Sequence, residues 1–355
     1  MDLSLDAFLA LPEAEQVPLI GDRAVLYASQ FERATLDRLC AVAEAARSLH
    51  RTQHGATFLG GRIPNRMALN FFAQPSSRTF MSFNTAQAAL GFERVSVRDV
   101  GRSSMSKGES LIDSIRTYIS YVDVIVMRHP DEDAAATAFW AASRAHRRLR
   151  AGKREVPIPI ISGGSGSKHH PTQALLDVYT LQRHLGSLEG RTLLLVGDLR
   201  RGRTARSLAQ LARLYPGLKL RFAAPEAYQM LPDITAQLDA AGVDWERVPT
   251  LADGLSGADA VYMTRIQDEW DGPKTGGHVA AHPDFRFERS HLDQLADHAV
   301  LLHPLPKRDE IEPAIDELND PRVGYWHQER NGVWMRVALL AWLFGVDDVI
   351  LEAVP

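Results

Sequence analysis

The segment FFAQPSSRTFMSF, residues 71–83, joins an apolar run to a helix-like pattern, and several anion-binding groups stand at the junction. These groups are the hydroxyls of Ser76, Ser77 and Thr79 and the guanidinium of Arg78. The first backbone N–H groups of a helix have no partner within the helix, and the helix dipole leaves partial positive charge there. The pattern therefore predicts an anion site, and phosphate is the anion that fits best. A Ser-rich N-cap beside a surface arginine is the alternative interpretation.

A second arginine could serve the same anion. Arg128 ends the apolar run VDVIVM and is expected at the buried end of a strand. A charge in such a place needs an anionic partner, because burying it unpaired is costly. The partner is either a bound phosphate or a local carboxylate, and the sequence leaves both open.

Seven sequence blocks, in order along the chain, resemble those of one family. They are PSSRT at 75–79, SSMSKGESL at 103–111, VMRHP at 126–130, HPTQALLD at 170–177, VGDLRRGRT at 196–204, YMTRIQ at 262–267 and HPLP at 303–306. Together they resemble the aspartate/ornithine carbamoyltransferase family from about residue 30 to the C-terminus. HPLP and TRIQ resemble its aspartate branch, since HCLP is typical of the ornithine branch.

The resemblance implies an enzyme that transfers a carbamoyl group from carbamoyl phosphate to the amine of L-aspartate, the committed step of pyrimidine biosynthesis. The products would be N-carbamoyl-L-aspartate and phosphate. No metal, organic cofactor or covalent intermediate is expected, because holding two substrates together and stabilising the oxyanion would supply much of the rate. Two alternatives stay open. One is a carbamoyltransferase with a different amino acid or amine as acceptor, and the other is a weakly active homologue that acts as a partner in a complex.

The resemblance also implies roles for individual residues. Arg78, Thr79, His170 and Lys107 would be catalytic. Carbamoyl phosphate would contact Ser76, Ser77, Arg78, Thr79, Ser103, Lys107, Arg128, His170, Gln173, Leu305 and Pro306. Aspartate would contact Lys107, Arg203, Arg265 and Gln267. Two arginines suit a substrate with two carboxylates, because each guanidinium binds a carboxylate with forked donors.

Four positions depart from the family pattern. Gln74 and Trp270 stand where a Glu and an Arg are usual, and in the family those two charges help to hold the closed, active arrangement. Losing both charges is milder than losing one, because no charge is left uncompensated. Phe80 and Lys307 each replace an arginine. The phosphate residues are intact, so these changes affect the expectation for the acceptor more than that for carbamoyl phosphate.

The segment around Ser103 and Lys107 bears on assembly. In the family this loop reaches into the active site of a neighbouring subunit, which implies a homotrimer with shared sites. Further assembly with regulatory or other pathway chains is left open. KGES at 107–110 could also cap the helix that follows it, and both roles can hold together.

The elements that would position these residues alternate along the chain. Strands are expected at 66–72, 92–97, 123–129, 191–199, 218–225, 244–249, 259–266 and 299–306, with helical patterns between most of them. Nearly continuous apolar strands favour parallel sheets that are covered on both faces. We therefore expect an α/β protein with two doubly wound parallel-sheet domains and the active site in the cleft between them. The carbamoyl-phosphate domain would be 1–170 plus a C-terminal helix, about 325–355, and the amino-acid domain 171–324.

Composition limits the remaining function classes. The chain of 355 residues is 45% hydrophobic and 24% charged, with a net charge of −4. Its basic residues are scattered, so binding to nucleic acid is not expected. No apolar run is long enough to span a membrane, and the first residues are acidic, so a cytoplasmic location is expected. Cys40 is the only cysteine, which excludes an internal disulfide and suggests a core thiol.

Overall fold

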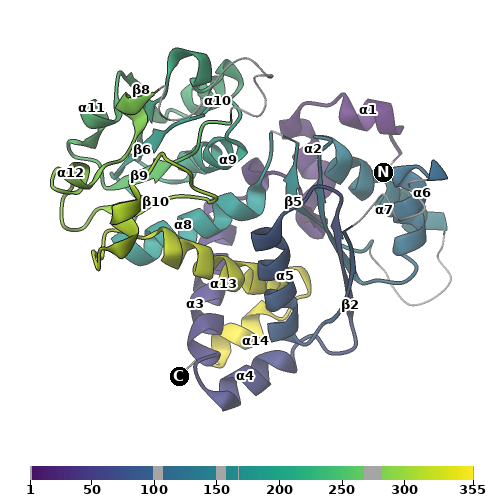
Figure 1. Ribbon diagram of the computed structural model, residues 1–355. Coiled ribbons are helices and arrows are strands. Elements are labelled where there is room, and N and C mark those ends of the chain that lie inside the picture. Colours follow the sequence, from purple (N-terminus) through teal and green to yellow (C-terminus); the bar gives the residue numbers. More distant parts are fainter. Residues whose placement is uncertain (1, 99–106, 149–156, 167, 268–281, 355) are drawn as a thin grey trace. The chain divides into compact units, whose positions relative to one another are not determined.

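The computed structural model describes residues 2–98, 107–148, 157–166, 168–267 and 282–354. The chain forms two compact units (Figure 1). The first unit is Met1–Thr172 together with Gly332–Pro355, and the second is Gln173–Asn331. Each unit has a five-stranded sheet in which all neighbouring strands run parallel. The expected α/β class with two parallel-sheet domains is confirmed.

The first sheet has the strand order β1-β5-β4-β2-β3. In chain order its strands are β1 (Ala24–Val25), β2 (Met67–Phe72), β3 (Glu93–Val97), β4 (Val124–His129) and β5 (Ile160–Ser165). The pairing of β2 with β4 brings Phe72 opposite Arg128. The carboxyl ends of these parallel strands therefore meet at one edge of the sheet, which is where ligands bind in open α/β sheets.

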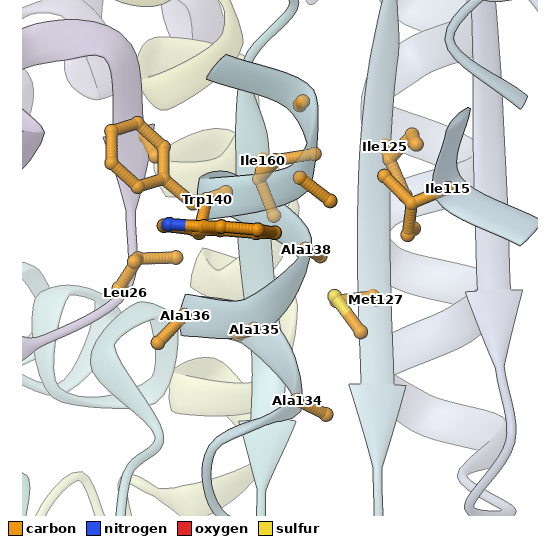
Figure 2. Close-up of a cluster of buried hydrophobic side chains, with 14 of the residues drawn as sticks. Leu26, Ile115, Ile125, Met127, Ala134, Ala135, Ala136, Ala138, Trp140 and Ile160 are labelled. Carbon is orange, nitrogen blue, oxygen red and sulfur yellow. The ribbon is translucent and has the colours of Figure 1, made fainter. Parts of the chain in front are cut away.

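Helices cover the first sheet on both faces (Figure 1). The helices that lie wholly within this unit are α1 (Leu5–Leu9), α2 (Glu13–Ile20), α3 (Arg33–Leu49), α4 (Gln53–Gly60), α5 (Ser77–Leu90), α6 (Leu111–Tyr118), α7 (Ala134–Arg148) and α14 (Asp347–Glu352). Alanines of α7 pack with Trp140 against Met127 and Ile160 of the sheet (Figure 2). Small side chains let the helix approach the strands closely, and the buried indole of Trp140 donates to Leu3 O over 2.9 Å.

The second sheet has the order β10-β9-β6-β7-β8. Its strands are β6 (Thr192–Val196), β7 (Lys219–Ala223), β8 (Asp244–Val248), β9 (Ala260–Met263) and β10 (Val300–Leu302). The helices that lie wholly within this unit are α9 (Arg203–Leu211), α10 (Pro232–Ala240), α11 (Leu251–Leu255) and α12 (Arg289–Leu292). The chain passes between the two units within α8 (Pro171–Leu185) and again within α13 (Tyr325–Leu343). Apolar strand residues such as Leu194, Val261 and Leu301 form the core of this unit.

Most expected elements are present, and the exceptions have local causes. Gly91 ends α5 in the left-handed conformation, with φ of 90°, which is typical of a glycine at a helix C-terminus. The predicted continuous C-terminal helix is wrong, because Gly345 at φ of 66° separates α13 from α14. The strand β5 was not predicted, since prolines and glycines around it are typical of loops. Cys40 is buried in α3 as expected, and burial raises the pKa of its thiol.

The described residues show neither a membrane-spanning helix nor a cluster of metal ligands. No described helix is long and apolar enough to cross a membrane. The described residues also contain no group of three or more His, Cys, Asp or Glu placed to hold a metal ion.

Candidate active site

The predicted phosphate loop lies at the start of α5, directly after β2. Ser76 is the N-cap residue of α5. Its side chain makes no capping hydrogen bond to the described residues of this helix. The first N–H groups of α5 therefore point out of the helix beside the hydroxyls of Ser76 and Ser77. Arg78 is exposed in the first turn, and Thr79 is buried below it. This arrangement suits an anion, because N–H groups, hydroxyls and a guanidinium meet at the positive end of a helix dipole.

The neighbouring strand ends bring further groups to this loop. The Gln74 N–H donates to Arg128 O over 3.2 Å, which ties the end of β2 to that of β4. Arg128 Nη1 donates to Gly163 O of β5 over 3.1 Å. A Cβ atom at Gly163 would lie 3.3 Å from Met127 O and 3.4 Å from Thr79 Cγ2. Gly163 is thus a residue that the sequence analysis missed, although the run SGGSGS carries the signal for it.

His170 precedes α8 and is 4% exposed. Its neighbour His169 is held separately, with its ring 4.8 Å from that of Tyr27 and its Nδ1 3.9 Å from Glu13 Oε2. Both partners belong to the first thirty residues of the chain. The N-terminal segment thus packs beside His169 and supports the chain at the entry to α8.

Lys107 is exposed, and Gly108 follows it with φ of 93°. Two residues later Ser110 caps α6 by accepting from the Asp113 N–H over 3.1 Å. The capping role expected for KGES is therefore confirmed, and it leaves the ammonium of Lys107 exposed. Ser103 lies outside the described residues.

In the second unit, Arg203 is the first residue of α9, and Arg265 follows β9. Burial, and then the nearby positive charge of Arg265, lowers the pKa of Arg203 to about 10. The positive charges of Arg203 and Arg265 repel each other, and a bound anion would offset this repulsion. Arg206 also lies on α9, but it is buried and pairs with Asp233 at 3.3 Å between Nη1 and Oδ1.

A buried carboxylate holds the two arginine-bearing loops together. Asp198 Oδ1 accepts from the Arg201 N–H over 2.9 Å, and Asp198 Oδ2 accepts from the Gln267 N–H over 3.3 Å. Arg201 Nη1 in turn donates to Gln267 O over 2.9 Å. Asp198 is fully buried and was not among the predicted site residues, although it lies within the block VGDLRRGRT. Its role is to fix the loops that carry Arg203 and Arg265.

The remaining predicted residues of this unit are Gln173 and the HPLP segment. Gln173 lies in the first turn of α8, and its Nε2 donates to Asp177 Oδ1 over 2.9 Å. The Leu305–Pro306 peptide bond is cis, and Leu305 has φ of 52°. The Leu305 N–H donates to Nδ1 of His303 over 2.8 Å, which fixes the turn.

Three of the four departures from the family pattern lie in described residues. Phe80 packs edge-on against Phe72 at 5.5 Å between ring centroids, and the guanidinium of Arg98 lies 4.3 Å from the Phe80 centroid. Lys307 forms an ion pair with Asp316. Gln74 is half-buried, and Trp270 lies outside the described residues.

Comparisons with known proteins give one consistent result. Residues 23–183 match the family model described as "Aspartate/ornithine carbamoyltransferase, carbamoyl-P binding domain", and residues 189–343 match "Aspartate/ornithine carbamoyltransferase, Asp/Orn binding domain". The chain is 40% identical over 317 residues to aspartate carbamoyltransferase 1, chloroplastic, of Pisum sativum, covering 89% of this chain and 77% of the pea protein. It is 40% identical over 326 residues to the chloroplastic aspartate carbamoyltransferase of Oryza sativa subsp. japonica, covering 90% and 84%.

A solved structure agrees with these relatives. It is the aspartate transcarbamoylase of Trypanosoma cruzi in complex with carbamoyl phosphate, with a TM-score of 0.79 and 34% identity. The match covers 92% of this chain and 97% of that one.

Proposed function

Because the chain belongs to the aspartate/ornithine carbamoyltransferase family, we propose that it transfers the carbamoyl group of carbamoyl phosphate to the amine of L-aspartate. The products are N-carbamoyl-L-aspartate and phosphate. The observation that carries the aspartate assignment is the pair Arg203 and Arg265, whose loops Asp198 joins. Two adjacent guanidinium groups suit a substrate with two carboxylates.

The chemistry follows from the two sets of groups. The start of α5, with Ser76, Ser77 and Arg78, holds the phosphate together with Arg128. Arg78, Thr79 and His170 donate to the carbonyl oxygen of the carbamoyl group, which becomes negative as the amine attacks. The new C–N bond forms, the C–O bond to phosphate breaks, and the departing phosphate accepts the proton of the amine.

In the second unit, Gln173 and the carbonyls of Leu305 and Pro306 accept from the carbamoyl –NH2 group. Arg203, Arg265 and Gln267 bind the two carboxylates of aspartate.

We also propose the assembly that the sequence predicts, a homotrimer in which Ser103 and Lys107 of one chain complete a neighbour's site. Lys107 is exposed, as a residue that serves a neighbouring chain must be before assembly. Light scattering and subunit mixing test this proposal. The cytoplasmic location also stays a proposal, for which cell fractionation is the test.

A substrate panel tests the reaction. The protein is incubated with carbamoyl phosphate and one of several amino acids, including aspartate and ornithine, and phosphate release is measured with product mass. We expect release with aspartate, and a marked loss of saturation by aspartate in Arg203→Gln. The matched control is Arg200→Gln, because Arg200 is exposed and donates only weakly, over 3.4 Å, to Ala227 O. Release with another amino acid and not with aspartate would overturn the acceptor assignment and favour a paralogue with a different acceptor.

A further inference from the structure

A continuous chain of hydrogen bonds, buried except at its Leu305 end, links Gln173 to the HPLP segment within the second unit. Gln173 Nε2 donates to Asp177 Oδ1 over 2.9 Å, and Gln328 Nε2 donates to the same oxygen over 2.7 Å. Gln328 Oε1 accepts from the His303 N–H over 2.8 Å, and His303 Nδ1 accepts from the Leu305 N–H over 2.8 Å. Asp177, Gln328 and His303 are each at most 2% exposed. Hydrogen bonds shielded from water in this way are costly to break.

Asp177 sets the direction of the Gln173 amide. An ionised carboxylate has no donor, so only the –NH2 end of an amide can bind it. The hydroxyl of Tyr262 donates to the other oxygen, Asp177 Oδ2, over 2.7 Å. Burial and the charge of Asp177 raise the pKa of Tyr262, so the phenol keeps the proton that it donates. With its –NH2 end on Asp177, Gln173 turns its oxygen, Oε1, the other way.

The same logic fixes the tautomer of His303. Its Nδ1 accepts from the Leu305 N–H, so the proton of the neutral ring is on Nε2, which lies 2.7 Å from Glu310 Oε1. Burial raises the pKa of Glu310, but the hydrogen bonds that it accepts from His303 and from the Arg308 N–H outweigh this effect and leave the pKa below its usual value. Glu310 is therefore an ionised acceptor for Nε2–H. The backbone N–H of Leu305 is thereby anchored, which holds the start of the segment that carries the carbonyls of Leu305 and Pro306.

We infer that Asp177, Gln328 and His303 are positioning residues that make the carbamoyl-amide end of the site a set of acceptors, and so select an acyl group that ends in –NH2. The inference rests on the proposed function, because it concerns the same site. An –NH2 group donates two hydrogen bonds, whereas the methyl group of acetyl phosphate is of similar size and donates none. A site built around hydrogen bonds to a substrate N–H rejects an analogue that lacks it.

The test measures equilibrium binding by calorimetry with three probes: carbamoyl phosphate, acetyl phosphate and inorganic phosphate. The variant is Gln328→Met, which keeps the shape of the side chain and removes both of its hydrogen bonds. We expect the affinity for carbamoyl phosphate to fall about 10-fold or more, because the freed amide and peptide lose their fixed direction. Affinities for acetyl phosphate and inorganic phosphate should stay within about twofold of the parent, since neither uses these acceptors. A parallel loss for all three probes, or no loss for carbamoyl phosphate, overturns the inference.

Two further variants keep the result interpretable. Gln210→Met is the matched control, because Gln210 is 4% exposed in the same unit and bonds Gln237 on α10 instead of this network. It should leave all three affinities unchanged. Tyr262→Phe removes one hydroxyl from Asp177 and is the substitute if Gln328→Met does not fold. Tyr262→Phe should lower the affinity for carbamoyl phosphate alone by about threefold. An equal loss of affinity for acetyl phosphate would count against the inference.

Failure of this inference can be told apart from failure of the proposed function. A parent protein that binds carbamoyl phosphate no better than acetyl phosphate overturns the selection described here. A parent that distinguishes the two ligands but forms no carbamoyl-aspartate overturns the acceptor assignment alone.

Discussion

Replacing Gly197 with alanine should damage the amino-acid half of the site and leave the phosphate half intact. Gly197 follows β6 with φ of 109°, a region that residues with a side chain rarely adopt. A Cβ atom there would lie 2.1 Å from the carbonyl oxygen of Thr264, the residue before Arg265. The next residue, Asp198, joins the loops that carry the two arginines. The added methyl group thus pushes on both loops at once.

Gly197→Ala should lower the free energy of unfolding for two reasons, an unfavourable backbone conformation and a steric clash. A second glycine of the chain allows the two effects to be measured separately. Gly186 also has positive φ, 78°, but nothing lies within 4 Å of a Cβ placed on it. Gly186→Ala should therefore cost about 1–2 kcal/mol, from backbone conformation alone. Gly197→Ala adds a clash with backbone that cannot rotate away, and it disturbs the 2.8 Å bond from the Thr264 N–H to Val196 O. We expect Gly197→Ala to lower the free energy of unfolding by about 3–5 kcal/mol, the range of severe single substitutions.

Thermal unfolding and steady-state kinetics are the assays. The melting temperature should fall by about 10 °C in Gly197→Ala and by about 3 °C in Gly186→Ala. The KM for aspartate should rise at least about 10-fold in Gly197→Ala only, because Arg203 and Arg265 are displaced. The dissociation constant of inorganic phosphate should stay unchanged in both variants. Equal effects of the two substitutions, or a loss of phosphate binding in Gly197→Ala, would contradict the proposed clash between residue 197 and Thr264.

Three further predictions concern the catalytic groups and the departures from the family pattern. Arg78→Ala should lower kcat by about 10²–10³ with an unchanged circular dichroism spectrum, because it removes a donor to both phosphate and oxyanion; activity within a few-fold of the parent would contradict the assignment. Mixing inactive Lys107→Ala with inactive Arg78→Ala chains should restore activity if sites are shared between subunits, whereas no recovery in trimers shown to be mixed would mean that one chain builds each site. The pair Gln74→Glu with Trp270→Arg should raise kcat/KM for aspartate more than the two single changes combined, and strictly additive effects would show that the two positions are not coupled.

The sequence predicted the order and type of most elements because apolar strands and amphipathic helices alternate with clear breaks. It failed where local composition contradicted the tertiary context. The strand β5 contains Gly163 and Gly164 and follows two prolines, so its neighbours in the sheet, more than its own residues, make it a strand. The C-terminal helix was predicted as one because its apolar pattern continues past Gly345, where the backbone turns left-handed.

The candidate site could be proposed from the sequence where one residue type would perform one task at a strand end, as for Arg78, Arg128 and Arg203, whose roles stay predictions. It was not predictable where the role depends on partners far away in the chain. Asp198 and Gly163 act by holding other residues, and Gln328 contributes from α13 to a segment that follows β10. Asp198 and Gln328 carry no signal of their own in a single sequence, because a buried Asp or Gln has the same local pattern whether it is structural or positions a ligand.

The departures from the family pattern and the buried network bear on different substrates. The residues that hold the carbamoyl-amide end are buried and bonded to one another, so a change in any of them leaves an unsatisfied polar group. Phe80 and Lys307 instead lie in local contacts of their own, with Phe72 and with Asp316. Substitutions with such local partners can be accepted without disturbing the carbamoyl end. If specificity has shifted in this chain, the shift should therefore appear in the choice of acceptor, while selection of carbamoyl over acetyl phosphate should be retained.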